Sequence, residues 1–295
     1  LALMPAADGT TIGIGASAAG VFNISAADFP FIQDGWSEII VGRATGTATM
    51  DVRTTAAWND NLTLQSNTGA INITTAINVG ANNLTFVTDG NIGLSVTNAI
   101  AGTGTLNFRQ QSAGANVGLS GSAGALNLSN TEIGRIADGW SQINVGRADA
   151  VGTMTISGSA STWKDNVTFL SGTGAIVVGV GQVFGANAVA IVTDGDISLN
   201  VTNSLYASGG TLAITQRSAG TTIGLGDGQA GDITLNTTEI TRLRDGFTQI
   251  TIGRADGTGA INIGNSTWLD PLIVQTGSGA INVNASTVTT TTNAL

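Results

Sequence analysis

The chain has 295 residues, 42 of them glycine, no cysteine and no histidine, and a formal net charge of −9. The absence of cysteine and histidine excludes a disulfide framework, the usual zinc sites and a nucleophile–base pair that uses either residue. An acidic chain with a single lysine, Lys164, lacks the basic face that nucleic-acid binding requires, and no run of about 18 apolar residues predicts a membrane-spanning helix.

The first predicted element is a β-strand at the start of the sequence. Residues 1–15 align without gaps with residues 212–226, and Leu1 matches Leu212, the third residue of a Gly-Thr-Leu-Ala-Ile motif. Leu1 therefore lies inside a strand motif, and we expect the natural chain to continue upstream. Since no basic, apolar secretory signal opens the sequence, we expect any export signal to lie outside this segment.

A long repeat runs along the whole chain. Asp-Gly-aromatic occurs at 34–36, 138–140 and 245–247, Val-Gly-Arg or Ile-Gly-Arg follows each copy, and three tryptophans are 105 residues apart. A period of about 105 residues divides the chain into repeats 1–105, 106–211 and an incomplete 212–295. We expect these repeats to form one continuous solenoid, as a segment of a longer chain.

A shorter motif, Gly-x-apolar-x-apolar, is nested inside the long repeat. Gly69-Ala-Ile-Asn-Ile is one copy, and related copies follow at intervals averaging about 21 residues, which makes five units per long repeat. We expect the glycine to supply a turn with positive φ, and the alternation that follows is typical of a strand.

These spacings predict an all-β fold, a parallel β-helix with about 21 residues per coil and five coils per repeat. Tandem β-sandwiches of about 100 residues are the alternative, because they also place strands every 8–12 residues, but they have no reason to repeat one motif every 21. No amphipathic helical stripe of useful length is present. Outward positions are Asn, Thr or Ser, which avoid the repulsion of like charges stacked at the strand spacing.

The stretch Asp-Gly-Phe-Thr-Gln-Ile-Thr-Ile-Gly-Arg-Ala-Asp-Gly-Thr-Gly-Ala-Ile at 245–261 resembles repeats of giant bacterial surface proteins. These are the filamentous-haemagglutinin-like and related adhesins, and the similarity of pattern covers the chain. The resemblance implies a right-handed parallel β-helix shaft, secretion to the cell exterior, and a role in adhesion, matrix or filaments. It carries over no functional residue, and no segment similar to the family's secretion domain is present.

Three Asp-Gly turns offer carboxylates, at Asp34, Asp138 and Asp245. Calcium needs six to eight oxygen ligands, whereas each turn has one carboxylate nearby, so a tight turn is the simpler interpretation. The stretch 226–232 resembles a calcium-binding nonapeptide repeat but occurs once. The sequence thus predicts no cofactor, with calcium as the open alternative.

An arginine ends one strand of each long repeat, at Arg43, Arg147 and Arg254. Asp149 and Asp256 lie two residues after the second and third of these, and Thr45 stands in the first repeat. We interpret each arginine as one half of an Arg–Asp ion pair at a coil corner, and the alternative is a row of arginines that binds a ligand.

The three tryptophans spaced by 105 residues, Trp58, Trp163 and Trp268, are the second candidate row. Regularly spaced indoles stack well on sugar rings, so they offer a glycan-binding surface; packing over a coil corner is the more ordinary role. Trp36, Trp140 and Phe247 follow the Asp-Gly turns, and we expect them to pack in the same way.

The sequence therefore predicts a structural shaft or fibre segment of an extracellular bacterial surface protein. Its expected partners are flanking repeats or copies of itself stacked end to end, since uncapped solenoid ends expose strand edges. An adhesive module that binds glycans or cells is the alternative. A polysaccharide-degrading β-helix enzyme is more remote, because the 19 acidic residues are spread along the repeat rather than gathered in one groove.

Overall fold

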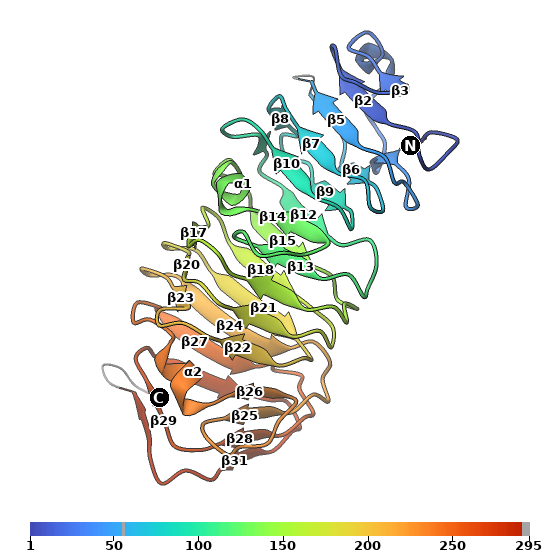
Figure 1. The fold of residues 1–295 in the computed structure, drawn as a ribbon. Helices are drawn as coiled ribbons and strands as arrows, with labels where there is room; N and C mark the ends of the chain where they lie inside the picture. Colours follow the sequence, from blue (N-terminus) through green and yellow to red (C-terminus); the bar gives the residue numbers. More distant parts are fainter. Residues whose placement is uncertain (55–56, 291–295) are drawn as a thin grey trace. The chain divides into compact units, whose positions relative to one another are not determined.

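A computed structural model describes residues 1–54 and 57–290, and the chain divides into two compact units, Leu1–Gly146 and Arg147–Leu295. Each unit consists mainly of short parallel strands, with only brief helices (Figure 1). None of the helices in the described parts of the chain has the length and apolar character needed to cross a membrane. The expectation of an all-β, parallel-strand fold is confirmed at this level.

The first unit contains one long parallel sheet. Neighbouring strands pair in register, with Leu62 opposite Leu84 and Leu84 opposite Leu106. In sheet order the strands are β1 (Ala2–Leu3), β4 (Ile39–Gly42), β6 (Leu62–Gln65), β9 (Leu84–Val87), β12 (Thr105–Arg109) and β15 (Gln142–Gly146).

The remaining strands of the first unit form shorter parallel sheets. One has the order β3 (Phe22–Ile24), β2 (Ile12–Gly15), β5 (Met50–Arg53), β7 (Ile71–Ile73) and β10 (Ile92–Leu94). Two pairs accompany it, β13 (Val117–Leu119) with β14 (Leu126–Leu128) and β8 (Ile77–Asn78) with β11 (Ile100–Ala101). The helices of this unit are η1 (Phe29–Phe31) and α1 (Asn130–Gly134).

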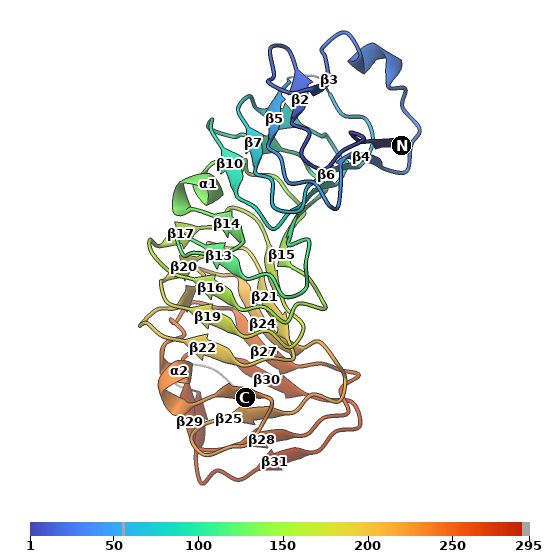
Figure 2. The ribbon, with the colours of Figure 1, turned by 45° about the vertical axis from the view of Figure 1, so that its right-hand side comes forward.

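The second unit repeats this organisation, and Figure 2 shows its strands side by side. Its long sheet runs β18 (Val167–Leu170), β21 (Val189–Thr193), β24 (Thr211–Gln216), β27 (Gln249–Gly253) and β30 (Leu272–Gln275). A second set comprises β16 (Met154–Ile156), β19 (Ile176–Val178) and β22 (Ile197–Leu199), then β26 (Ile233–Leu235), β25 (Ile223–Leu225), β28 (Ile261–Ile263) and β31 (Ile281–Val283). A third comprises β17 (Ser161–Thr162), β20 (Gln182–Val183) and β23 (Leu205–Tyr206), with the pair β29 (Ser266–Trp268) and β32 (Val288–Thr290). Its helix is α2 (Thr237–Thr241).

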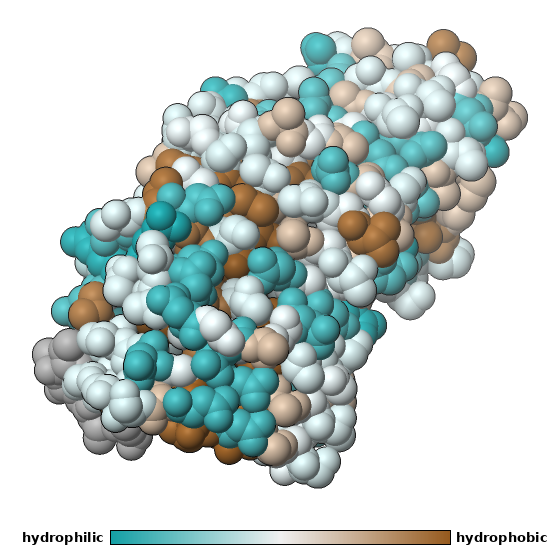
Figure 3. Space-filling model, turned by 60° about the horizontal axis from the view of Figure 1, so that its bottom comes forward, coloured by the Kyte–Doolittle hydropathy of each residue, from teal (hydrophilic) through white to brown (hydrophobic). Residues whose placement is uncertain are grey.

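Apolar side chains stack on equivalent side chains through both cores. Met50, Ile71 and Ile92 are register partners in the first unit and are fully buried. Polar side chains stack on the outer side: the Asn144 amide donates to the Asn107 side-chain oxygen over 2.9 Å, and Asn282 donates to Asn262 over the same distance. Figure 3 shows the surface as a mixture of polar and apolar residues. Alternation along each strand therefore sorts apolar residues inward and amide ladders outward, as the sequence predicts.

The spacing of strands in the long sheets differs from the expected five coils per repeat, averaging about 21 residues each. In the long sheet of the second unit, Val167 pairs with Val189, Val189 with Leu212, Leu212 with Ile250 and Ile250 with Leu272. The steps are 22, 23, 38 and 22 residues, so one long repeat adds four strands to this sheet. The fifth Gly-x-apolar motif, at Gly231, precedes β26. This strand pairs with β25, and both strands lie within the 38-residue step. That motif adds a strand to a neighbouring sheet instead of a coil of its own.

The glycines that open the short motif are needed for a different reason from the expected turn with positive φ. Gly69, Gly174 and Gly279 are not among the residues with positive φ. A Cβ atom on Gly174 would stand 2.0 Å from the carbonyl oxygen of Gly152, and one on Gly279 would stand 2.1 Å from that of Gly259. These glycines therefore allow close backbone contact between the segments that precede neighbouring parallel strands.

Two short helices interrupt the strands, and the sequence analysis does not predict them. Both carry a reciprocal capping box: Ser129 and Glu132 cap α1, and Asn236 and Glu239 cap α2. The pattern Ser/Asn-x-x-Glu was the available signal for these helices. An amphipathic stripe could not reveal them, because each spans five residues.

Candidate functional site

The tryptophans proposed for sugar stacking lie in the core. Trp58, Trp163 and Trp268 are 3%, 2% and 1% exposed. A sugar stacks on an open ring face, and these indoles present none to solvent. The structure therefore places all three indoles in the packed core, away from solvent.

The surroundings of each indole explain its burial. The Trp163 ring meets Phe169 edge to face with centroids 5.7 Å apart, and its Nε1 donates to Gln182 Oε1 over 3.0 Å. Trp268 Nε1 donates to Ser266 Oγ over 3.1 Å. Trp58 packs edge to face on Phe29 at 5.1 Å. Each indole is thus held by an aromatic neighbour or a polar acceptor of its own unit.

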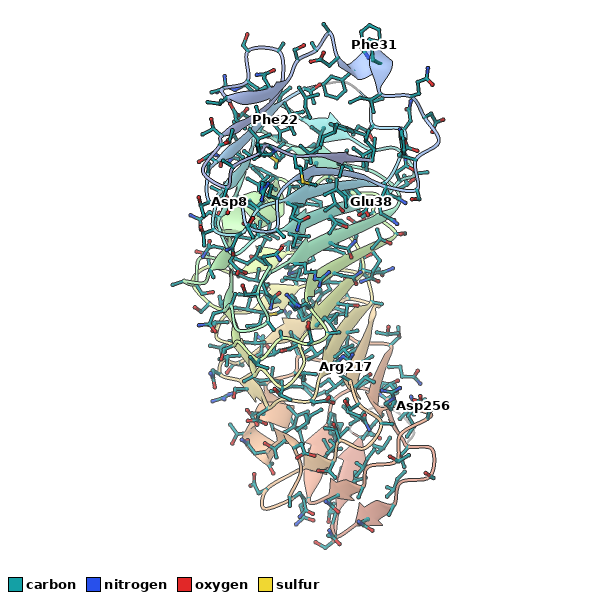
Figure 4. All side chains as sticks on the ribbon, turned by 90° about the vertical axis from the view of Figure 1, so that its right-hand side faces the viewer. Asp8, Phe22, Phe31, Glu38, Arg217 and Asp256 are labelled. Atoms are coloured by element: carbon teal, nitrogen blue, oxygen red, sulfur yellow. The ribbon has the colours of Figure 1, made fainter. Side chains whose placement is uncertain are left out.

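The arginine row forms ion pairs at coil corners. Arg254 donates two hydrogen bonds to the Asp256 carboxylate, from Nε over 2.6 Å and from Nη2 over 2.7 Å. Arg147 donates to Asp149 from the same two nitrogens. The hydrogen bond from Arg254 lowers the pKa of Asp256 below its ordinary value. The remaining nitrogen of Arg254, Nη1, donates to the backbone carbonyls of Gln216 and Arg217 on the adjacent coil. Figure 4 shows Arg217 and Asp256 on this part of the second unit.

In the first repeat, the aspartate that pairs with the arginine comes from a different part of the chain. Arg43 Nε lies 2.8 Å from a carboxylate oxygen of Asp8, and its Nη1 donates to the carbonyls of Pro5 and Ala6. Thr45, which stands where the other repeats have aspartate, donates from Oγ1 to Asp8 over 2.6 Å and is the main cause of the lowered pKa of Asp8. The three arginines therefore bind their own chain, and this agrees with the Arg–Asp corner interpretation.

The three Asp-Gly aspartates are exposed, and each of two turns is held by a buried aspartate further along the chain. The amide of Gly35 donates to Asp60 Oδ1 over 3.1 Å, and that of Gly246 donates to Asp270 Oδ1 over 2.9 Å. Gly35 and Gly246 have φ of +116° and +137°, which explains glycine in this turn. Asp60 and Asp270 are not among the predicted site residues, and the repeated Trp-x-Asp spacing is the signal in the sequence that marks them.

Burial dominates the electrostatics of Asp270, which is 2% exposed. Burial raises the pKa of the Asp270 carboxyl, the neighbouring Asp245 carboxylate raises it further, and the Gly246 amide opposes both. Within the described residues, no three acidic side chains gather closely enough to suggest a metal-ion site at Asp34, Asp138 or Asp245. The contacts found here belong to turns: Asp60 and Asp270 accept hydrogen bonds from the backbone amides of Gly35 and Gly246.

Buried threonines form another set of contacts that the sequence analysis missed. Thr193 Oγ1 lies 3.2 Å from the carbonyls of both Gly172 and Gly174 and 2.9 Å from the amide of Gly195. Thr88 makes the same contacts with Asn67, Gly69 and Gly90 in the first unit. Each hydroxyl therefore links segments about 20 residues apart in the chain, and the repeated Val-Thr-Asp-Gly sequence was its only signal.

The aromatic residues after the Asp-Gly turns do not share one environment. Trp140 and Phe247 are each 3% exposed, as expected, whereas Trp36 is 46% exposed. Trp36 borders an apolar hollow of about 550 Å³ in the first unit, which we call the N-terminal hollow; among its lining residues are Leu1, Leu3, Phe22, Ile24, Phe31 and Ile32. Phe31 is 83% exposed and points outward in Figure 4.

Comparisons with models of protein families, with curated proteins and with solved structures found no match.

Proposed function

We propose that each unit is a parallel β-helix in which a coil of about 22 residues contributes one strand to each of three sheets. The register supports this arrangement: Leu84, Ile92 and Ile100 of β9, β10 and β11 lie opposite Leu62, Ile71 and Ile77 of the preceding turn of chain. Three consecutive strands thus shift together by 22, 21 and 23 residues. Such a shift is what one coil stacking on the next requires.

We further propose that the chain is a structural shaft or fibre segment of an extracellular bacterial surface protein and has no enzymatic role. The observation that carries this proposal is the use of the repeated residues in coil-to-coil contacts. The arginines, buried tryptophans, buried threonines and motif glycines all bind the chain to itself. A chain whose repeated residues serve its own stacking suits a projecting shaft, as the resemblance to giant adhesins implies.

The adhesive alternative receives no support from the candidate rows. Glycan recognition would use exposed aromatic rings, and the three repeated indoles are buried. The arginines are likewise occupied by aspartates and backbone carbonyls.

Immunoelectron microscopy of the source cells tests the proposed role and location. Antibodies raised against the 295-residue chain are expected to label filaments or matrix outside the cell envelope. Label confined to the cell interior would overturn the extracellular shaft. A crystal structure of the same chain tests the β-helix separately, and strands that close into sandwiches would overturn it.

A further inference from the structure

A polar groove of about 490 Å³ lies on the outer face of the first unit. Its floor is formed by β5 and β7, and the segment between β2 and β3 stands beside it at Ala19 and Gly20. Figure 1 shows β2, β5 and β7 side by side, and β5 and β7 are each paired along both edges by strands of the same unit. The floor is therefore complete within the first unit, and the volume of the groove falls in the range of small-ligand sites.

An ion pair between Asp51 and Arg53 occupies the floor of the groove. Both residues alternate along β5 with Met50 and Val52, which are buried in the core, so their side chains point outward. Arg53 Nε donates to Asp51 Oδ2 over 2.7 Å, and the side chains of Arg53 and Asp51 are 46% and 12% exposed. A guanidinium has five N–H donors, so Arg53 retains donors beyond the one that Asp51 accepts.

The Asp51 carboxylate is held in one orientation by three donors. Besides Arg53, the Ala19 amide donates to Oδ2 over 3.2 Å, and the Thr74 hydroxyl donates to Oδ1 over 3.1 Å. A carboxylate offers about four acceptor sites, so these bonds leave room for a further donor at Oδ1. The pair thus presents a fixed acceptor next to a cationic donor.

The contacts between neighbouring strands do not require charges at these positions. In the third repeat, Asn262 pairs with a glycine of β25 as Asp51 pairs with a glycine of β2, and the Asn262 amide donates to the Ala230 carbonyl over 2.8 Å. An uncharged side chain therefore holds the segment beside the groove equally well. Gly264 stands in the place of Arg53 in that repeat. The ion pair is thus a feature of the first repeat that the shared architecture does not explain.

The rest of the groove is lined by uncharged polar groups. Thr11, Thr49 and Ser95 contribute hydroxyls, and Asn72 contributes an amide. Because the ion pair has no net charge, the groove is not built to attract an ion, but it offers a donor and an acceptor side by side. A sugar hydroxyl both donates and accepts, so two neighbouring hydroxyls can bind both members of the pair at once.

We propose that this groove binds a neutral sugar residue of a glycan. One sugar hydroxyl donates to Asp51 Oδ1, its neighbour accepts from the Arg53 guanidinium, and the surrounding hydroxyls and the Asn72 amide complete the contacts. This site is separate from the buried tryptophan row. It adds a ligand to the shaft function proposed above and does not depend on that function.

Glycan-array binding of the 295-residue chain tests this site, followed by ligand-observed NMR with the methyl glycosides of glucose, galactose, mannose and N-acetylglucosamine. Millimolar binding of at least one neutral sugar is expected, and added salt should leave it unchanged because the ligand has no charge. Asp51→Asn and Arg53→Met are each expected to weaken binding at least about tenfold. Asp51→Asn introduces the side chain that the third repeat carries at this position, so the fold is expected to survive, and circular dichroism checks both variants. Arg217→Met, at an exposed arginine of the second unit, is the matched control and is expected to bind like the unaltered chain.

The outcomes of these measurements separate the proposed site from its alternatives. Absence of binding to every neutral glycan would overturn the proposal, and so would binding that the folded Asp51→Asn and Arg53→Met variants retain. Binding of methyl glucuronide alone, weakened by salt, would show an anion site at Arg53 instead and would contradict a neutral ligand. None of these results bears on the shaft function, which the labelling of cells tests separately.

Discussion

Arg43 and Asp8 form the ion pair that Arg254 and Asp256 form elsewhere, although 35 residues separate the first two and two residues separate the second. In both corners the guanidinium also donates to two carbonyls of the adjacent coil, those of Pro5 and Ala6 or of Gln216 and Arg217. The corner is therefore preserved in space while the source of its carboxylate changes. Substitutions in the second unit separate the contribution of the ion pair from that of the carbonyl contacts.

Replacing Arg254 with methionine is expected to destabilise the chain by about 1 kcal/mol, because the backbone carbonyls of Gln216 and Arg217 lose a charged donor. Asp256→Asn is expected to have little effect, since the carboxylate is exposed and water screens the pair. Urea unfolding followed by circular dichroism measures both. Equal losses for the two variants would show that the ion pair, and not carbonyl binding, stabilises the corner.

Trp163→Ala is expected to cost about 3 to 5 kcal/mol, because it leaves a cavity beneath Phe169 and removes a hydrogen bond to Gln182. Trp163→Phe keeps most of the volume and is expected to cost about 1 to 2 kcal/mol for the lost hydrogen bond to Gln182. Trp36→Ala is the control, since that ring is half exposed and a much smaller loss is expected. Chemical denaturation decides among these values, and a mild effect of Trp163→Ala would contradict a packing role.

Thr193→Val removes a hydroxyl that contacts two carbonyls and one amide, and the valine methyl cannot replace these bonds. The expected loss is about 1 to 3 kcal/mol, because the groups left behind are buried. Thr193→Ser keeps the hydroxyl and is expected to retain most of the stability. Hydrogen exchange at the amide of Gly195 offers a local measurement, in which valine but not serine should speed exchange.

The acid stability of the chain is expected to depend on Asp270. Its pKa is raised in the folded state, so the contribution of this group to stability is present below the ordinary value of 3.8 and is lost as the pH rises through the raised value. Burial also raises the pKa of Glu239, which acts in the same direction. Asp194, Asp232 and Asp256 have lowered pKa values, so their contributions are present above 3.8 and are lost only in stronger acid.

Asp270→Asn isolates this effect. The amide keeps an acceptor for Gly246 and does not ionise, so the decline in unfolding free energy as the pH rises above 3.8 should become shallower. Urea midpoints measured across that range provide the test. The exposed Asp245→Asn removes the neighbouring charge and should shift the decline to lower pH without abolishing it. An unchanged profile in Asp270→Asn would contradict the assignment.

Gly174→Ala is expected to destabilise the chain by more than about 1 kcal/mol, because the new Cβ would overlap the Gly152 carbonyl and force successive coils apart. Gly114→Ala is the matched control: no atom lies within 4 Å of its added Cβ and its φ is not positive. The control is expected to be neutral or slightly stabilising, since alanine restricts the unfolded chain. Thermal unfolding distinguishes them.

Much of the fold could be predicted because identical short strands have identical surroundings. Alternation at Ile71-Asn72-Ile73 indicates which side chains face inward, and a repeated motif indicates stacking of like on like. Regular spacing could not reveal the 38-residue step from Leu212 to Ile250. Each glycine motif in the sequence marks one strand, but only the observed strand pairing shows which sheet that strand joins.

The contacts of the candidate residues also divide into those that are local in the sequence and those that are not. The spacing of Arg254 and Asp256 was enough to predict their pairing, which is local. Nothing local connects Arg43 with Asp8, or Gly246 with Asp270, because those contacts pass between coils.

The periodicity, the inward and outward faces of the strands and the acidic, cysteine-free chemistry are visible in the amino-acid order, because these properties depend on residues a few positions apart. Which repeated residues are open to solvent depends on the folded chain. Trp163 and Trp36 are both tryptophans in repeated motifs, yet one is buried and the other is half exposed. The difference arises from the neighbouring coil, since burial depends on what stacks against a side chain and not on the motif that contains it.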